Sequence, residues 1–155
     1  LELVSYEERD DFVDIARRNV RDYFGELPAQ WELIRGQVQS CDRPNYFDRV
    51  ILDMLAPWEC LEMSSRVLRP GGVLCLYVAT TTQLSKSAEA IKELKRFSEP
   101  ESFELMLRSW HHEGLAVRPQ HSMNAHTGFL LFTRLMSTEF ASISRRRRPQ
   151  SSNPR

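Results

Sequence analysis

Apolar and polar residues alternate along this chain with two different periods, which predict helices and strands in turn. Over residues 8–24, apolar side chains recur every three or four positions, as expected for a helix with one buried face. Gly25 follows directly and predicts the end of this helix. Further helices are expected over residues 58–68, which Pro57 can start, and over residues 82–96.

Short apolar runs between these helices have the length of buried strands. Those that alternate with helices are residues 1–6, 31–35, 48–53 and 73–79. After Pro100 the helices stop, and strands are expected over residues 103–110, 114–117 and 127–135. Strands that alternate with helices form a parallel sheet, and strands joined by loops add an antiparallel strand at its edge. We therefore predict an α/β fold with a mostly parallel sheet.

Composition narrows the class of protein. The chain has 155 residues, 41% hydrophobic and 27% charged, which suits one globular domain and excludes disordered and collagen-like chains. Its longest wholly apolar run, residues 73–79, is too short to cross a bilayer, so no membrane association is expected. Three cysteines without a C-x-x-C pair predict free thiols in a reducing cytoplasm and no metal site. They are Cys41, Cys60 and Cys75.

The net charge of zero conceals an arginine-rich end. Residues 145–148 and Arg155 place five positive charges on the last eleven residues, which contain no acid. Together with the prolines and serines there, this predicts a disordered tail over residues 137–155 after a folded domain over residues 1–136. The tail could lie along a phosphate backbone, or it could be a solvated extension without a role.

Polar side chains follow three of the predicted strands. In a doubly wound sheet, ligands bind at the carboxyl ends of the strands. Glu7 follows the first strand and can accept hydrogen bonds from ribose hydroxyls; Gln37 follows the second, where it could meet an adenine edge. Asp53 ends the third strand. The alternative for either acid is that it caps a helix.

The segment DMLAPW, which begins at Asp53, is more specific. An acid, a short apolar loop, Pro57 and Trp58 together provide an acceptor, a restricted backbone and a stacking surface. This arrangement suits an enzyme that holds a flat base by its amino group. The structural alternative is that Asp53 caps the following helix while Trp58 fills the core.

Four segments together resemble a known family. They are SYEERDDFVDIARRNV, DRVILDMLAPWECL, LRPGGVLCLYVATTTQL and GLAVRPQHSMNAHTGFL. The resemblance is to the bacterial tRNA (adenine-58-N1)-methyltransferases, especially their actinobacterial members, and it runs from Val4 to about Arg134. It implies a Rossmann-like class I methyltransferase fold, S-adenosylmethionine (SAM) as cofactor, and N1 of adenine 58 in the T-loop of tRNA as the methyl acceptor. It also implies a cytoplasmic homotetramer.

The resemblance assigns roles to individual residues. Glu7 corresponds to the acid that binds the cofactor ribose, and Gln37 and Val38 lie near the cofactor adenine, although the family usually has Asp where this chain has Gln37. Asp53 corresponds to the acid beside the methionine part of the cofactor and the target adenine. Residues implied to bind the substrate are Pro57, Trp58, Tyr77, Gln83, His126 and Thr127.

The chemistry that the resemblance implies depends on how N1 of the target adenine is placed against the methyl group of SAM. Methyl transfer from a sulfonium is an in-line displacement, and N1 of adenine has a free lone pair, so no strong base is needed. Asp53 would accept a hydrogen bond from the adenine amino group and stabilise the positive charge that develops on the base. His121 and His126 are candidates for general bases, although hydrogen-bonded structural histidines are the more common case.

The family also has parts that this chain does not show. Its strand order is 3-2-1-4-5-7-6, and its first strand ends in a glycine-rich turn, whereas this chain has no G-x-G pattern and opens at Leu1 rather than methionine. We therefore expect a C-terminal part of a longer enzyme, truncated before its first strand. Two alternatives stay open: a non-catalytic RNA-binding subunit, or a class I methyltransferase with a protein or small-molecule substrate.

The expected truncation makes a prediction for the isolated 155-residue chain. Because the expected missing strand would pair with two others, the chain alone should be poorly stable and should bind SAM weakly or not at all. Titration calorimetry with SAM measures this, and a micromolar dissociation constant for the chain alone would contradict the expectation.

Overall fold

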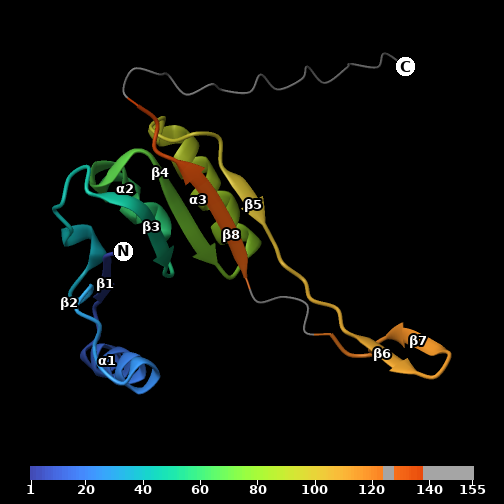
Figure 1. Cartoon of the computed structure of the whole chain (residues 1–155). Coiled ribbons are helices and arrows are strands. Elements are labelled where there is room, and N and C mark those ends of the chain that lie inside the picture. The colour runs from blue at the N-terminus through green and yellow to red at the C-terminus, as the bar shows by residue number, and fades with distance from the viewer. Residues whose placement is uncertain (124–127, 138–155) are drawn as a thin grey trace, which may run out of the picture. The chain divides into compact units, whose positions relative to one another are not determined.

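The computed structural model describes residues 1–123 and 128–137 (Figure 1). The chain divides into two compact units, Leu1–Arg43 and Pro44–Arg155, and each is described by itself. The predicted tail and the target-pocket residues His126 and Thr127 lie outside the described residues, apart from Ser137.

The first unit is a β-α-β arrangement. Its elements are β1 (Leu3–Glu7), α1 (Asp10–Phe24), β2 (Trp31–Arg35) and the 3-10 helix η1 (Val38–Ser40). β1 and β2 pair in parallel, with Leu3 opposite Trp31 and Glu7 opposite Arg35. α1 ends at Gly25, whose φ of 82° is a left-handed conformation that glycine adopts without strain. The strands and the helix expected for this segment are therefore confirmed.

The second unit is built on a four-stranded sheet. Its elements are β3 (Phe47–Asp53), η2 (Pro57–Cys60), α2 (Leu61–Val67), β4 (Leu68–Val78), α3 (Thr81–Leu94), β5 (Glu101–Phe103), β6 (Trp110–Glu113), β7 (Ala116–Pro119) and β8 (Phe129–Arg134). The strand order is β3-β4-β8-β5, in which β3 and β4 are parallel and β8 runs antiparallel to both of its neighbours. This order equals the 4-5-7-6 half of the expected topology, and the β1-β2 pair equals its 2-3 half.

The core of the second unit lies between one face of this sheet and helices α2 and α3. Alternate residues of β4 are fully buried, namely Leu74, Leu76 and Val78, as the period of a strand requires. Leu131 of β8 and Ile91 of α3 are fully buried as well. Figure 1 shows α3 lying along the sheet behind β4 and β8. On β3 the alternation leaves Ile51 69% exposed.

Two expected boundaries differ from the structure around α2. The helix expected over residues 58–68 is a 3-10 turn followed by the short α2, and the strand expected from residue 73 begins at Leu68. The segment Pro70-Gly71-Gly72 lies within β4 and does not interrupt it. Gly71 adopts a φ of 81°, and its N–H donates to the Leu135 carbonyl at 2.8 Å. Gly72 is needed at its position, since a Cβ there would lie 2.8 Å from the Arg69 carbonyl oxygen.

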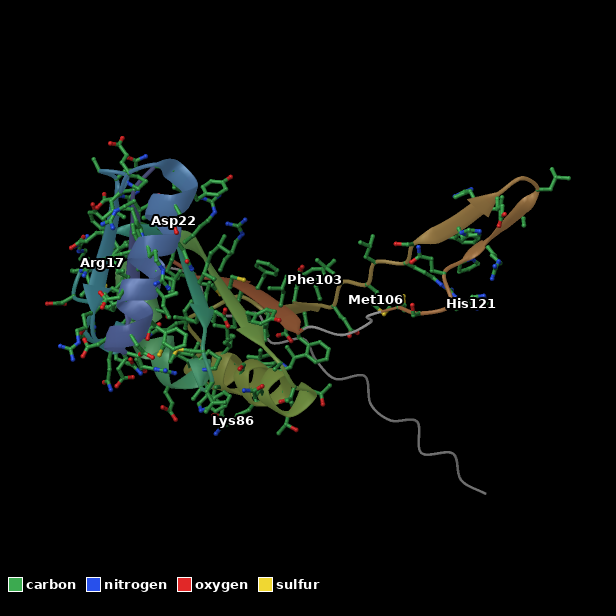
Figure 2. The ribbon with its side chains drawn as sticks, turned by 90° about the horizontal axis from the view of Figure 1, so that it is seen from below. Arg17, Asp22, Lys86, Phe103, Met106 and His121 are labelled. Atoms are coloured by element: carbon green, nitrogen blue, oxygen red, sulfur yellow. The ribbon has the colours of Figure 1, made fainter. Side chains whose placement is uncertain are left out.

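The strand expected over residues 103–110 is wrong. β5 ends at Phe103, residues 104–109 form no strand, and a hairpin of β6 and β7 follows, with Gly114 at its turn. The strand was predicted from the apolar residues in this segment, but Leu105 and Leu107 are 76% and 85% exposed. Their spacing therefore does not mark a buried face. Figure 2 shows Phe103 and Met106 along this segment.

No helix in residues 1–123 or 128–137 is long and apolar enough to cross a membrane. Within the same residues, no group of three or more His, Cys, Asp or Glu side chains could hold a metal ion.

Two buried serines on the helices of the second unit provide a matched prediction. Ser64 donates a hydrogen bond to the Cys60 carbonyl at 2.8 Å, whereas the Ser87 hydroxyl is buried without a partner in the described structure. We expect Ser87→Ala to raise the free energy of unfolding by up to about 1 kcal/mol and Ser64→Ala to lower it by about 1 kcal/mol. Urea denaturation of both variants checks this, and a loss of stability in Ser87→Ala would show that its hydroxyl has a partner.

Candidate active site

Asp53 lies at the carboxyl end of β3, in register with Tyr77 on the parallel strand β4. Residues paired in this way present their side chains on the same face of a sheet. Asp53 is exposed, and its carboxylate makes no hydrogen bond or ion pair within the described residues. The residues that precede η2 and α2 are Ala56 and Cys60, and neither caps through its side chain. The alternative that Asp53 caps the next helix is therefore wrong, and its carboxylate is available to a ligand.

The loop after Asp53 leads into η2 through a buried proline. Pro57 occupies the first turn of η2, where its fixed φ is favourable, and it is buried. Trp58 is half-buried, so it does not fill the core, and the Lys86 ammonium of α3 lies 4.1 Å from the centre of its ring. This contact is a cation–π interaction. Lys86, labelled in Figure 2, was not predicted from the sequence.

Gln83 contacts the same loop from the start of α3. Its Nε2 donates to the Leu55 carbonyl at 3.0 Å, and its Oε1 accepts from the backbone N–H groups of Ala79 and Thr80 at 3.2 and 3.1 Å. The Thr80 hydroxyl also accepts from the backbone N–H of Gln83, which completes a capping box. Gln83 was predicted to bind the substrate, but its amide is occupied by the protein.

The Tyr77 ring packs directly on the backbone of Gly128. A Cβ added to Gly128 would lie 2.4 Å from Cζ of the ring, so any side chain there would displace the tyrosine. Gly128 was not among the predicted site residues, although it directly follows the His126-Thr127 pair on which the resemblance relied.

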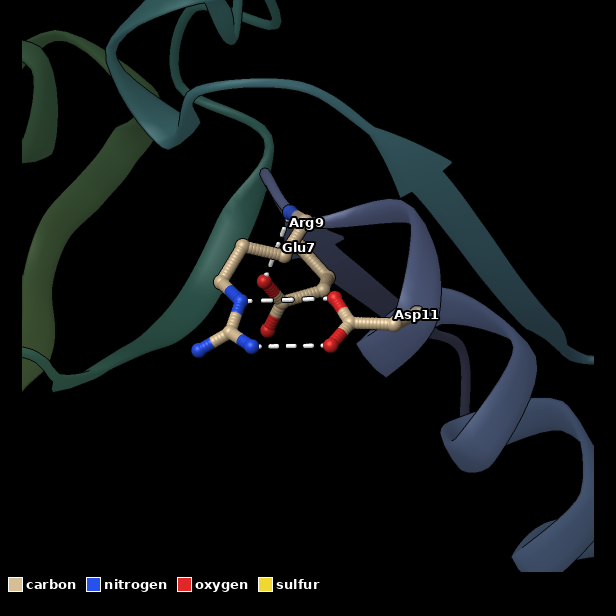
Figure 3. Close-up of polar contacts among 3 residues, drawn as sticks. All are labelled: Glu7, Arg9 and Asp11. Carbon is tan, nitrogen blue, oxygen red and sulfur yellow. Dashed lines mark hydrogen bonds and ion pairs between the residues drawn. The ribbon is translucent and has the colours of Figure 1, made fainter.

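In the first unit, the carboxyl ends of β1 and β2 place Glu7 beside a short turn. Oε1 of Glu7 accepts the Arg9 N–H at 2.9 Å, and Arg9 forms an ion pair with Asp11 at 2.8 Å (Figure 3). The hydrogen bond from Arg9 lowers the pKa of the Asp11 carboxyl below its usual value. The second oxygen of Glu7 has no partner in the described residues, so the turn holds this carboxylate and leaves one acceptor available.

The other predicted cofactor residues lie at the end of β2. The Gly36 N–H donates to the Glu7 carbonyl at 2.9 Å, and the Gln37 side chain donates to the Glu8 carboxylate at 3.0 Å. Val38 follows as the first, half-buried residue of η1. The structure therefore brings Glu7, Gln37 and Val38 together, and it adds Glu8, which the sequence did not indicate.

The candidate general base His121 is exposed and contacts the guanidinium of Arg118. Arg118 belongs to the hairpin strand β7, and both side chains line a shallow surface hollow with His111. This favours the structural alternative for His121.

All three cysteines are free, as predicted, and the structure shows that all three are buried. Burial raises the pKa of the Cys75 thiol; burial, and then the Glu59 carboxylate, raise that of Cys60. Cys60 Sγ also lies 3.5 Å from Met54 Sδ, a contact that joins η2 to the loop after Asp53. Burial therefore disfavours the reactive thiolate form of Cys60 and Cys75.

The strand order and the acid at the end of β3 define a class of protein. The fold is that of the Rossmann-like class I methyltransferases. No family model matches the chain. A tRNA (adenine(58)-N(1))-methyltransferase TrmI of Thermus thermophilus is 28% identical over 130 residues, which cover 84% of this chain and 50% of that protein.

Solved structures agree on the fold. The tRNA (m1A58) methyltransferase TrmI of Aquifex aeolicus is 25% identical with a TM-score of 0.79, covering 88% of this chain and 54% of its own. A SAM-dependent O-methyltransferase of Thermotoga maritima is 22% identical with a TM-score of 0.78, covering 95% of this chain and 52% of its own. The chain thus spans about half the length of the relatives that it matches.

The buried thiols predict a pH dependence. Because the folded state raises the pKa of Cys60 and Cys75, these thiols leave stability unchanged below the ordinary thiol pKa of 9.0 and reduce it as the pH rises above that value. Replacing each with Ala should make the decline of unfolding free energy between pH 8 and pH 10, roughly the range of thiol ionisation, shallower. Denaturation curves across this range measure it, and an identical decline in both variants and the parent would contradict it.

Proposed function

We propose that this chain is part of a SAM-dependent methyltransferase that methylates N1 of adenine 58 in tRNA. The observation that carries the proposal is the Asp53 carboxylate, which lies beside Tyr77 and has no partner in the part of the chain that the structure describes, in a chain 28% identical to a tRNA (adenine(58)-N(1))-methyltransferase over 84% of its length. The role of each residue follows from its chemistry.

The residues at the ends of β1 and β2 fit the adenosine half of the cofactor. Glu7 keeps one carboxylate oxygen for ribose hydroxyls, while the Arg9 N–H holds the other. Gln37 offers its amide oxygen to an amino group of adenine, because its Nε2 is engaged by Glu8, and the half-buried Val38 provides an apolar contact for the ring. SAM, when bound, supplies the methyl group that is transferred.

The residues at the ends of β3 and β4 fit the target base. Asp53 accepts a hydrogen bond from the exocyclic amino group of adenine and so orients N1. The same carboxylate stabilises the positive charge that N1 gains when it is alkylated, which is the principal electrostatic contribution this chain makes to the transition state. Tyr77, with Pro57 and Trp58, limits the orientation of the ring, and we include His126 and Thr127 in this pocket on the family resemblance alone.

The full-length protein is proposed to carry a further strand beside β3. β3 pairs only with β4 in the described residues, and Ile51 on its surface is 69% exposed. An unpaired edge with an exposed apolar side chain is the place where another strand adds. The exposed apolar side chains of residues 103–117 likewise support assembly into the homotetramer implied by the resemblance, and the three free cysteines support a cytoplasmic location.

Two other functions have specific observations in their favour. The absence of a G-x-G pattern and the uncharged Gln37 favour a non-catalytic RNA-binding subunit. The fold shared with an O-methyltransferase, at a TM-score of 0.78, is compatible with a class I methyltransferase that has a protein or small-molecule substrate. A full-length protein that binds tRNA without consuming SAM would support the first, and one that consumes SAM without modifying tRNA would support the second.

The direct test replaces Asp53 in the full-length protein and measures incorporation of labelled methyl groups into tRNA. We expect Asp53→Ala to lower kcat by about 100-fold to 1,000-fold, the loss typical for one group that stabilises transition-state charge. Asp53→Asn should lower kcat by a similar factor, because the amide of asparagine keeps the size of the side chain but not its charge.

The matched control is Asp48→Ala on the same strand. Asp48 forms an exposed ion pair with Arg69 at 3.0 Å, and such pairs contribute little to stability. Asp48→Ala should therefore retain the parent activity. Equal activity of the Asp53 variants and the parent would contradict the proposed role.

A further inference from the structure

Helix α3 holds the loop that follows Asp53 at two points. Gln83 Nε2 donates to the Leu55 carbonyl at 3.0 Å, and the Lys86 ammonium lies 4.1 Å from the centre of the Trp58 ring. Residues three apart on a helix share a face, so these side chains meet the loop on either side of Ala56 and Pro57. Both contacts link the start of α3 to the segment DMLAPW.

The orientation of the Gln83 amide is determined by its surroundings. Its Oε1 accepts from the Ala79 and Thr80 N–H groups and from the Thr80 hydroxyl at 3.0 Å, all donors at the amino end of α3. A nitrogen in that position would face donors, so Nε2 must point to the Leu55 carbonyl. One amide thus caps the helix with its oxygen and holds the loop with its nitrogen.

The loop has few other restraints on its outer side. It consists of residues 54–56, which belong to no helix or strand, and the Leu55 side chain is 81% exposed. On its inner side, Met54 contacts the buried Cys60. The Leu55 carbonyl is therefore the point where a hydrogen bond can set the direction of the backbone two residues after Asp53.

We propose that Gln83 is a positioning residue: through the Leu55 carbonyl it fixes the backbone that orients Asp53, and Lys86 assists by holding the Trp58 ring. This rests on the function proposed above, since it assigns Gln83 an indirect role in methyl transfer rather than contact with the base. A displacement of about 1 Å in a catalytic group lowers rates by about two orders of magnitude, so such a restraint has a measurable effect.

Two variants separate the loop contact from the helix cap. Gln83→Glu keeps an oxygen acceptor for the capping box, now as a carboxylate, but places a second oxygen opposite the Leu55 carbonyl, so it removes only the loop contact. Thr80→Ala removes the hydroxyl that accepts the Gln83 N–H at 3.2 Å and donates to Gln83 Oε1 at 3.0 Å, so it weakens the cap. The backbone N–H groups of Ala79 and Thr80 still hold Oε1 in this variant, so Nε2 keeps its contact with the Leu55 carbonyl.

The experiment measures kcat, the KM for tRNA and the thermal midpoint in the full-length protein. We expect Gln83→Glu to lower kcat about tenfold or more with a KM within about twofold of the parent and an unchanged midpoint. Thr80→Ala should lower the midpoint and keep the parent kcat. A parent-like kcat in Gln83→Glu, or an equal loss of kcat in both variants, would overturn the proposal.

Hydrogen exchange separates this proposal from the proposed function. The backbone N–H groups of residues 54–56 and of Trp58 should exchange faster in Gln83→Glu than in the parent, and not in Thr80→Ala, whether or not the protein methylates tRNA. Unchanged exchange in Gln83→Glu would refute the restraint. A parent protein that fails to methylate tRNA while showing the expected exchange would refute only the function.

Discussion

The structure depends on the parallel pairing of β3 with β4 and on the register that places Asp53 opposite Tyr77. This register is established after a shift between Phe47, which pairs with Leu68, and Arg49, which pairs with Val73. The Pro-Gly-Gly segment of β4 lies between these two partners. From Arg49 onward each residue of β3 has one partner on β4, so Asp53 and Tyr77 are neighbours on the same face of the sheet. A shift by one residue would turn Asp53 to the opposite face, where α2 and α3 pack.

In the proposed function, the electrostatics of the site depend on the Asp53 carboxylate, which has no protein partner within residues 1–123 and 128–137. While water solvates Asp53, its charge costs the fold little. In that proposal a bound base lowers the surrounding dielectric, so the same charge would interact more strongly with a developing cation. The Asp53 carboxylate must also point in a fixed direction. Three features restrain the backbone around it: the pairing with β4, the buried Pro57 and the hydrogen bond from the Gln83 amide to the Leu55 carbonyl. Tyr77 has a comparable restraint, since it lies against Gly128, where no side chain can fit.

Much of this arrangement could be predicted from the sequence, and the failures have physical causes. The helix over α1, the strands β1 to β4 and the position of Asp53 at a strand end followed from hydrophobic period and from glycine and proline positions. Residues 103–110 misled the prediction because their apolar side chains are exposed, so the spacing of apolar residues did not report burial there. The roles of the Leu55 carbonyl and of Lys86 could not be predicted in this way. Every residue has a backbone carbonyl, so the sequence does not mark one as an acceptor. A lysine on a helix surface can make many different contacts, and the sequence does not select one of them. Gly128 and Glu8 stood directly beside predicted residues, but only contacts in space show what they do.

The central claim is that Asp53 recognises the amino group of the target adenine. The most direct measurement is a double-mutant cycle on methyl transfer by the full-length protein, with tRNA carrying adenine or unsubstituted purine at position 58 and with Asp53 or Ala at this position of the enzyme. The lower intrinsic reactivity of purine affects both enzymes equally and cancels. If Asp53 accepts the amino hydrogen, the penalty for purine should be large in the parent and at least about tenfold smaller in Asp53→Ala. Equal penalties in the two enzymes would contradict the claim.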